Sequence, residues 1–174
     1  MTLSTFALRA HRDRATMGKV AAEAAAATLR EAVATRGHAR MIAAAAPSQL
    51  DVYGALAAEP DVPWDKITIF HMDEYAGLDA AAPQRFGNWL RTHLVDAVRP
   101  AKFHPIRTEL GDQGIEEYSA MLAEAPIDLV CLGIGVNGHI AFNDPPAADL
   151  EDPLPMSRHA QRSQPSAASR RRLL

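Results

Sequence analysis

Two stretches of this sequence place titratable side chains directly after short apolar runs. The first spans residues 128–144 and contains five strand-forming residues, three glycines within six positions, His139 and Asp144. The second spans residues 67–78 and places the adjacent acids Asp73 and Glu74 after a β-branched and aromatic run. An imidazole that titrates near neutral pH and a carboxylate are the usual groups for proton transfer. These two stretches are therefore the candidates for chemistry.

Both apolar runs predict strands, with residues 128–132 buried. The glycines that follow at 133, 135 and 138 allow a sharp turn that can present backbone N–H groups to a ligand. Open parallel α/β sheets place their chemistry at the carboxyl ends of strands, so we expect His139 and Asp73 at the same edge. Asp73 and Glu74 point to opposite sides of an extended backbone, and at most one faces a given pocket. Two alternatives stay open: His139 points at water from an ordinary glycine turn, and both acids are solvated.

Helical and strand patterns alternate along the rest of the chain. Helices are predicted over 17–34, 50–58, 88–98 and 115–125, and further strands over 40–45 and 103–106. Gly37 is expected to end the first helix, and Ser48, next to Pro47, to cap the second. The alternation predicts an α/β fold in three layers, with a Rossmann-like, mostly parallel sheet and helices on both faces.

The turn at residues 46–49 is a candidate phosphate site. A strand, a tight turn and a helix start offer backbone N–H groups and the positive end of a helix dipole. Ser48 would supply a hydroxyl group to the phosphate. The alternative, that Ser48 only caps the helix, is open, and both roles can hold at once.

Composition limits the classes of protein to which the chain can belong. Its 174 residues are 48% hydrophobic, which suits one domain with a real core. The amino end lacks an apolar leader, and charges break the alanine-rich runs well short of the roughly 20 residues that span a bilayer. The sequence thus predicts a soluble cytoplasmic protein with no membrane contact. The single cysteine, Cys131, lies in a predicted buried strand, where a packed side chain is favoured over a reactive thiol.

Charge and histidine spacing exclude two further classes. The net charge is −3, and the five arginines after residue 157 have no acid among them, so the body of the chain is acidic. We therefore expect no nucleic-acid partner. His71, His104 and His139 all fall near predicted strand ends, but their spacing matches no zinc signature. The sequence predicts neither a metal nor a cofactor.

The two motifs together resemble the glucosamine-6-phosphate deaminase family, whose superfamily also contains 6-phosphogluconolactonases. The resemblance rests on residues 70–75 (Phe-His-Met-Asp-Glu-Tyr), 77–78 (Gly-Leu), 133–135 (Gly-Ile-Gly) and 138–145 (Gly-His-Ile-Ala-Phe-Asn-Asp-Pro). A looser similarity runs from about residue 16 to residue 154. A histidine followed by Ile-Ala-Phe-Asn and an acid resembles the deaminases, whereas the lactonases tend to continue with a Thr-Ala-Ser type of run.

The resemblance implies a reaction and roles for several residues. Glucosamine 6-phosphate and water would become fructose 6-phosphate and ammonia, a step of N-acetylglucosamine catabolism. His139, with Asp144 behind it, would open the pyranose ring, and Asp73 would move a proton from C2 to C1. Asn137 and Asp144 stand where the best-known deaminases have an aspartate and a glutamate, so Asn137 could orient His139 or a water without polarising it. The predicted substrate-binding residues are Ser48, Glu74, Gly135 and Gly138.

Two other functions stay open at this point. A 6-phosphogluconolactonase would share the fold and the glycine–histidine turn, and a non-catalytic sugar-phosphate binder would fit Asn137 and the turn at 46–49, where many family members have glycines. A homo-oligomer is compatible with either.

The resemblance also implies sheet strands and basic residues beyond the loop at residue 145. The sequence instead changes near residues 152–154 to a tail rich in serine and arginine, as a shifted reading frame would produce. We therefore expect an incomplete domain over 1–156 that lacks its C-terminal strands, a disordered basic tail over 157–174, and weak or no activity.

Overall fold

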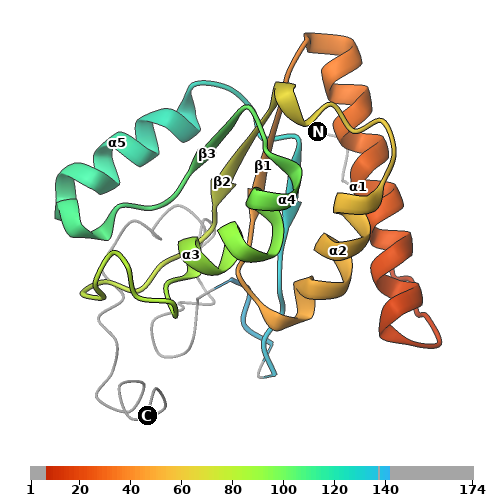
Figure 1. Cartoon of the computed structure of the whole chain (residues 1–174), viewed down its shortest axis with the longest axis horizontal. Helices are drawn as coiled ribbons and strands as arrows, with labels where there is room; N and C mark the ends of the chain where they lie inside the picture. Colours follow the sequence, from red (N-terminus) through yellow and green to blue (C-terminus); the bar gives the residue numbers. More distant parts are fainter. Residues whose placement is uncertain (1–6, 137, 142–174) are drawn as a thin grey trace.

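Parallel strands form the central layer of the structure, a computed structural model that describes residues 7–136 and 138–141 (Figure 1). Within those residues the sheet has four strands in the order β3-β2-β1-β4. Their bounds are Ala39–Ala43 for β1, Ile67–His71 for β2, Lys102–His104 for β3 and Leu129–Cys131 for β4. In the register of the sheet, Met41 of β1 lies between Ile69 of β2 and Leu129 of β4.

Helices connect the strands and cover the sheet. Five α-helical segments occur in the described part: α1 (Arg14–Arg36), α2 (Leu50–Ala58), α3 (Phe86–Leu90), α4 (Asp96–Val98) and α5 (Gly111–Ala123). A π-helical turn, Arg91–Val95, joins α3 to α4. Short 3₁₀ turns lie at Pro47–Gln49, Trp64–Lys66 and Thr108–Leu110.

The helix ends show how local sequence sets these bounds. The Asp13 carboxylate accepts a hydrogen bond of 2.7 Å from the Thr16 N–H group and caps α1, a signal that the sequence interpretation missed. Gly37 ends α1 in the left-handed conformation, at φ 80°, and its N–H group donates to the Val33 carbonyl, as predicted. The predicted bounds of α2 are confirmed.

Two predictions of local structure are wrong. Ser48 caps no helix, because neither the 3₁₀ turn at Pro47–Gln49 nor α2 has a side-chain capping hydrogen bond. The strand predicted as buried over residues 128–132 is shorter and only partly buried, with Val130 44% exposed. In the described residues β4 is hydrogen-bonded on one side alone, to β1, which explains this exposure.

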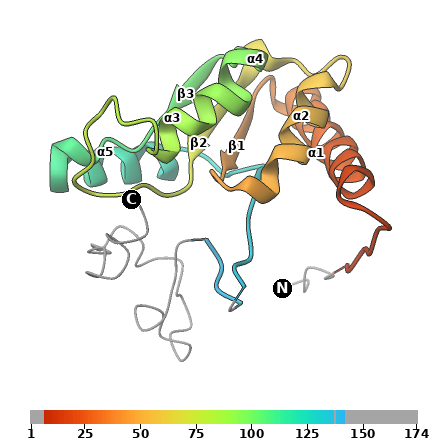
Figure 2. The ribbon, with the colours of Figure 1, turned by 60° about the horizontal axis from the view of Figure 1, so that its bottom comes forward.

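Alternating side chains of the strands divide the interior between two layers of helices. Met41, Ile67 and Ile69 are fully buried in the main core with α1, α2 and the α3–α4 segment. Phe70 points the other way, where its ring meets Tyr118 of α5 edge-on. Figures 1 and 2 show α5 on one side of the sheet and the other helices on the opposite side. The predicted three-layer α/β fold with a parallel sheet is confirmed.

Arg40 joins β1 to α5. Its guanidinium group donates hydrogen bonds to the carbonyl groups of Met121, Leu122 and Ala125 at the end of α5, and it lies 4.8 Å from the centre of the Phe70 ring. These contacts supply donors for helix carbonyls that have no partner within the helix. Among the residues described here, no helix is both long enough and apolar enough to span a bilayer. The predicted tail over 157–174 lies outside them.

Candidate active site

The order of the strands creates a switch point between β1 and β4. The chain runs from β1 outward to β2 and β3, then returns to place β4 on the other side of β1. Loops that leave the carboxyl ends of strands at such a point form the usual ligand crevice of open α/β sheets. Backbone hydrogen bonds hold these ends together: Ala44 donates to Cys131, and Met72 donates to Ala43.

The loop after β4 is a tight turn that holds His139. Ile134 and Ile140 form an antiparallel bridge, the Gly135 N–H group donates to the His139 carbonyl at 2.8 Å, and the Gly138 N–H group donates to the Gly135 carbonyl at 2.9 Å. The loop extends past the end of the sheet in Figure 2, drawn in blue. It carries the half-buried imidazole to the switch point.

The glycines of this loop serve its shape. The ring of His139 lies so close to Gly135 that a β-carbon there would overlap it, and Gly138 has φ +84°, which favours glycine. Both N–H groups are used inside the loop. A substrate-binding role for Gly135 and Gly138 stays a prediction, to which the structure adds a role in seating the imidazole.

The turn after β1 lies beside the same loop. The Ser48 hydroxyl oxygen is 3.9 Å from where a β-carbon on Gly133 would be, and Gln49 donates to the Leu132 carbonyl at 3.3 Å. The hydroxyl group of Tyr53 donates to the Ala44 carbonyl at 2.8 Å and fixes the end of β1. Since Ser48 caps no helix, its hydroxyl group is available for another partner.

Asp73 follows β2 at the same edge of the sheet. Its half-buried carboxylate accepts no hydrogen bond from the residues that the structure describes. Burial, with the nearby charge of Glu74, raises the pKa of Asp73 to about 6. A carboxylate with a pKa near the working pH can both take up and return a proton. Asp73 is therefore suited to proton transfer.

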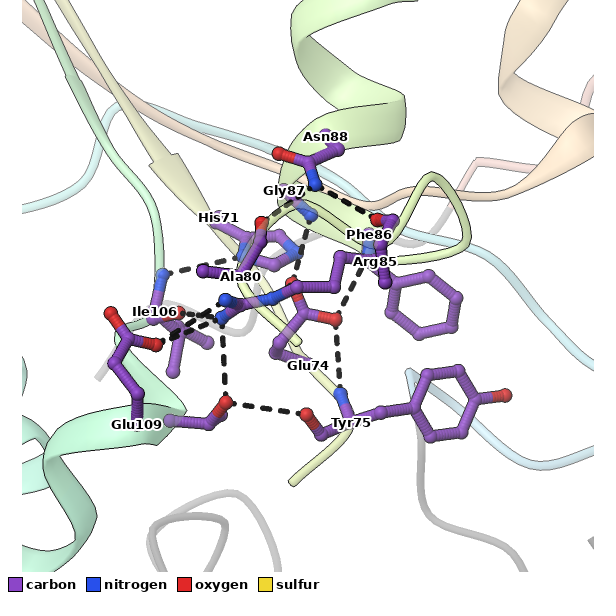
Figure 3. Close-up of polar contacts among 12 residues, drawn as sticks. His71, Glu74, Tyr75, Ala80, Arg85, Phe86, Gly87, Asn88, Ile106 and Glu109 are labelled. Atoms are coloured by element: carbon purple, nitrogen blue, oxygen red, sulfur yellow. Dashed lines mark hydrogen bonds and ion pairs between the residues drawn. The ribbon is translucent and has the colours of Figure 1, made fainter. Parts of the chain in front are cut away.

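The Glu74 carboxylate is buried and points toward the first residues of α3 (Figure 3). It accepts hydrogen bonds of 3.0 Å from the N–H groups of Tyr75, Phe86 and Gly87, and it pairs with Arg85. Substrate binding by Glu74 stays a prediction, but its oxygens already hold the start of α3. Arg85 was missed by the sequence interpretation because it lies in a loop without periodicity.

His71 is buried under this site. Its Nδ1 accepts a hydrogen bond of 3.4 Å from the Ile106 N–H group, and its Nε2 is buried without a partner in the described structure. Burial, with the charge of Arg85, lowers the pKa of His71 to about 3, so the ring stays neutral at physiological pH. The Tyr118 hydroxyl group donates to the His71 carbonyl and anchors the end of β2 to α5.

Two further features of the described residues bear on a binding or reactive role. A cavity of about 200 Å³ between α5 and β1–β3 is lined by residues that include Arg40, Phe70, Lys102, His104 and Glu124. The Cys131 thiol is buried, and burial raises its pKa to about 11, which supports the packed side chain predicted for it. In the part of the chain that the structure describes, no group of three His, Cys, Asp or Glu side chains could hold a metal ion. Asn137 and Asp144 lie outside the described residues.

This arrangement has relatives among known proteins. The sequence matches the family described as glucosamine-6-phosphate isomerases/6-phosphogluconolactonase over residues 12–170. The chain therefore belongs to this enzyme family. It is 36% identical over 131 residues to a glucosamine-6-phosphate deaminase from Streptococcus gordonii, covering 74% of this chain and 53% of that relative. A Streptococcus pneumoniae enzyme of the same name is 34% identical over 131 residues. The chain thus spans about half the length of the curated relatives that it matches.

Solved structures agree on the fold. A monomeric glucosamine-6-phosphate deaminase superposes with a TM-score of 0.68 at 21% identity, covering 78% of this chain and 58% of that one. A 6-phosphogluconolactonase from Shewanella baltica gives 0.66 at 24% identity, covering 75% and 57%. At these identities the likeness shows the shared α/β fold alone.

Proposed function

We propose that this chain carries the proton-transfer site of a glucosamine-6-phosphate deaminase, which converts glucosamine 6-phosphate and water to fructose 6-phosphate and ammonia. The observation that carries the proposal is the half-buried Asp73 carboxylate, with its pKa raised to about 6, at the carboxyl end of β2. Relatives of 34–36% identity with this name support the choice of substrate. We further propose that the protein acts in N-acetylglucosamine catabolism and is located in the cytoplasm.

In this proposal Asp73 works on the open-chain sugar. The carboxylate accepts the proton from C2, and the electron pair of the broken C–H bond forms a C1–C2 double bond while O1 takes up a proton. Return of the proton to C1 leaves an imine at C2. Water adds to that imine, and ammonia leaves. A group with a pKa near 6 fits both halves of the transfer, since it is mostly ionised at neutral pH and yet basic enough to pick up the proton.

His139 opens the ring. The imidazole moves the proton between O1 and O5, a transfer that its two ring nitrogens allow because one can accept a proton while the other donates one. Its seat against Gly135, on the loop at the switch point, supports this role. Asp144 as its partner acid and Asn137 as an orienting group stay predictions from the sequence. Ser48 beside the loop is the proposed hydroxyl contact of the sugar phosphate.

The test measures the formation of both products and the exchange of hydrogen for deuterium in the same incubation. Incubation with glucosamine 6-phosphate in D₂O should yield fructose 6-phosphate and ammonia in a coupled assay, with exchange at the transferred position seen by proton NMR. The variant Asp73→Asn should abolish both signals, because an amide cannot accept the C2 proton. Asp96→Asn, at an exposed position of α4, is the matched control and should behave as the wild type. A folded Asp73→Asn variant with full turnover excludes the proposed role.

A 6-phosphogluconolactonase is the second candidate, because the matched family includes that activity and lactonases share the fold. Lactone hydrolysis needs an activated water but no proton abstraction at C2, so Asp73→Asn should spare it. Retained lactonase activity in that variant favours the second candidate. Binding of a sugar phosphate without any turnover would instead indicate a non-catalytic binder. A homo-oligomer and the absence of a nucleic-acid partner stay predictions.

A further inference from the structure

A buried ion pair lies next to Asp73 in the chain (Figure 3). The Arg85 side chain is 8% exposed and that of Glu74 is 1% exposed, and the Arg85 Nε lies 3.4 Å from the Glu74 Oε2. A guanidinium group and a carboxylate are buried at a cost unless each finds its full set of partners. Here each group has several partners, which makes the pair a fixed feature of the fold.

Glu74 is held by backbone donors on one side. Its Oε1 accepts from the N–H groups of Tyr75 and Phe86, and its Oε2 accepts from the N–H group of Gly87, each at 3.0 Å. These contacts connect the residue after Asp73 to the beginning of α3. The carboxylate therefore cannot turn without breaking several hydrogen bonds.

Arg85 connects the same segment to the turn before α5. Its Nη2 donates to the Ile106 carbonyl at 3.1 Å and to the Thr108 hydroxyl oxygen at 3.3 Å, and Glu109 lies 3.3 Å from the guanidinium group. The Thr108 hydroxyl group in turn donates to the Tyr75 carbonyl at 3.3 Å. Glu74 directly, and Tyr75 through Thr108, are thus tied to one guanidinium group.

We propose that Arg85 is a positioning residue for Asp73 that acts through Glu74: it holds Glu74 in place and supplies the positive charge that offsets the charge of Glu74 beside the reacting carboxylate. The proposal rests on the proposed function in one respect, namely that Asp73 is the group that transfers the proton. The contacts of Arg85 with Glu74, and their effect on the charge near Asp73, do not depend on that function.

Burial keeps four other groups of this region in one protonation state near neutral pH. His71 is neutral because burial and Arg85 lower its pKa to about 3, and Tyr53 of α2 and Tyr118 of α5 are protonated because burial raises their pKa values. Cys131 of β4 is protonated as well, with a pKa of about 11. The ion pairs of this region are formed by Glu74, Arg85 and the more exposed Glu109. Burial is the main cause of the raised pKa of Asp73, and the charge of Glu74 adds to it. Because Arg85 pairs with Glu74, the guanidinium group is placed to offset that second contribution.

The experiment measures the titration midpoint of the Asp73 carboxyl group directly. The full chain is labelled with ¹³C at aspartate side-chain carboxyl groups, Asp73→Asn assigns the signal, and the shift is followed from pH 4 to pH 9. Arg85→Gln should move the midpoint upward by on the order of half a unit or more, because the charge of Glu74 is no longer offset. Glu74→Gln should move it downward by a similar amount.

Matched variants separate charge from packing. Arg85→Lys keeps the charge, so its midpoint should stay near that of the wild type even though the forked contacts are lost. Glu109→Gln removes an exposed partner of Arg85 that no described contact links to Asp73, and it should leave the midpoint unchanged. A merely structural role for Arg85 would not produce this sign pattern.

The outcomes decide the proposal without reference to turnover. If folded Arg85→Gln leaves the midpoint unchanged or lowers it, the proposal is wrong. If Arg85→Gln does not fold, Glu74→Gln and Arg85→Lys decide in its place, and a midpoint that does not fall in Glu74→Gln overturns the proposal. A correct sign pattern in a chain that turns over no amino-sugar phosphate would uphold the positioning role and reject the proposed function.

Discussion

The imidazole ring of His139 occupies the space in which a β-carbon at position 135 would have to lie. The two residues are also joined through the backbone, since the Gly135 N–H group donates to the His139 carbonyl at 2.8 Å. Position 135 is thus a seat for the histidine ring, and its glycine is required by space rather than by backbone conformation. The position of the His139 ring can therefore be tested by changing Gly135, which leaves the side chain of His139 itself unaltered.

Replacement of Gly135 by alanine should displace the His139 ring. The added methyl group cannot coexist with the ring in its present place, so we expect loss of most deaminase turnover together with altered His139 ring signals in NMR spectra. The control is Gly54→Ala in α2, where a β-carbon meets nothing within 4 Å and should stabilise the helix by about 0.5–1 kcal/mol. An active Gly135→Ala enzyme with unchanged histidine signals would contradict this seat.

Much of the site could be predicted from sequence because its signals are local. A short apolar run predicted the strand that forms β1, and a β-branched and aromatic run predicted β2. The different surroundings of Asp73 and Glu74 fit the expectation that adjacent residues of an extended chain point to opposite sides. The glycine spacing predicted a sharp turn before His139, and the structure has one.

The rest depends on contacts between residues far apart in the chain. Nothing near Arg85 indicates that its guanidinium group meets Glu74, eleven residues earlier, and the turn at 106–109. The partial exposure of Val130 depends on which strands lie beside β4, which a local apolar run does not reveal. Ser48 was expected to cap α2, but it lies inside the 3₁₀ turn that precedes the helix, and Gln49 occupies the cap position.

Asp73→Asn should stabilise the fold at neutral pH. The folded-state pKa of Asp73 is raised to about 6 from an ordinary value of 3.8, so its contribution to stability is complete below pH 3.8 and is lost as the pH rises through 6. The asparagine variant avoids that loss. We expect it to exceed the wild type by on the order of 1–3 kcal/mol at pH 8 and by little at pH 4, measured by urea unfolding. Asp96→Asn should show no such trend, and equal gains at both pH values would count against a raised pKa.

His71 should make the fold sensitive to acid. Its pKa is lowered to about 3 in the folded chain from an ordinary 6.5, so its contribution to stability is present above pH 6.5 and is lost as the pH falls toward 3. His71→Gln keeps an acceptor for the Ile106 N–H group but cannot be charged. Its stability should therefore fall less than that of the wild type between pH 7 and pH 4, by a difference on the order of 2–4 kcal/mol. The exposed His38→Gln variant is the control, and matching acid profiles for all three proteins would refute the prediction.

Ser48→Ala should separate affinity from stability. The serine hydroxyl group caps no helix, so its removal is expected to change the free energy of unfolding by no more than about 0.5 kcal/mol. If the hydroxyl group contacts the sugar phosphate, the same change should weaken binding of glucosamine 6-phosphate by about 10- to 150-fold, the range of one hydrogen bond to a charged partner. Calorimetry with the sugar phosphate and with inorganic phosphate measures both affinities, and Ser119→Ala on the exposed side of α5 is the matched control. Equal affinities in wild type and Ser48→Ala would remove the turn after β1 from the phosphate site, whereas a large loss of stability would show that Ser48 has a structural partner instead.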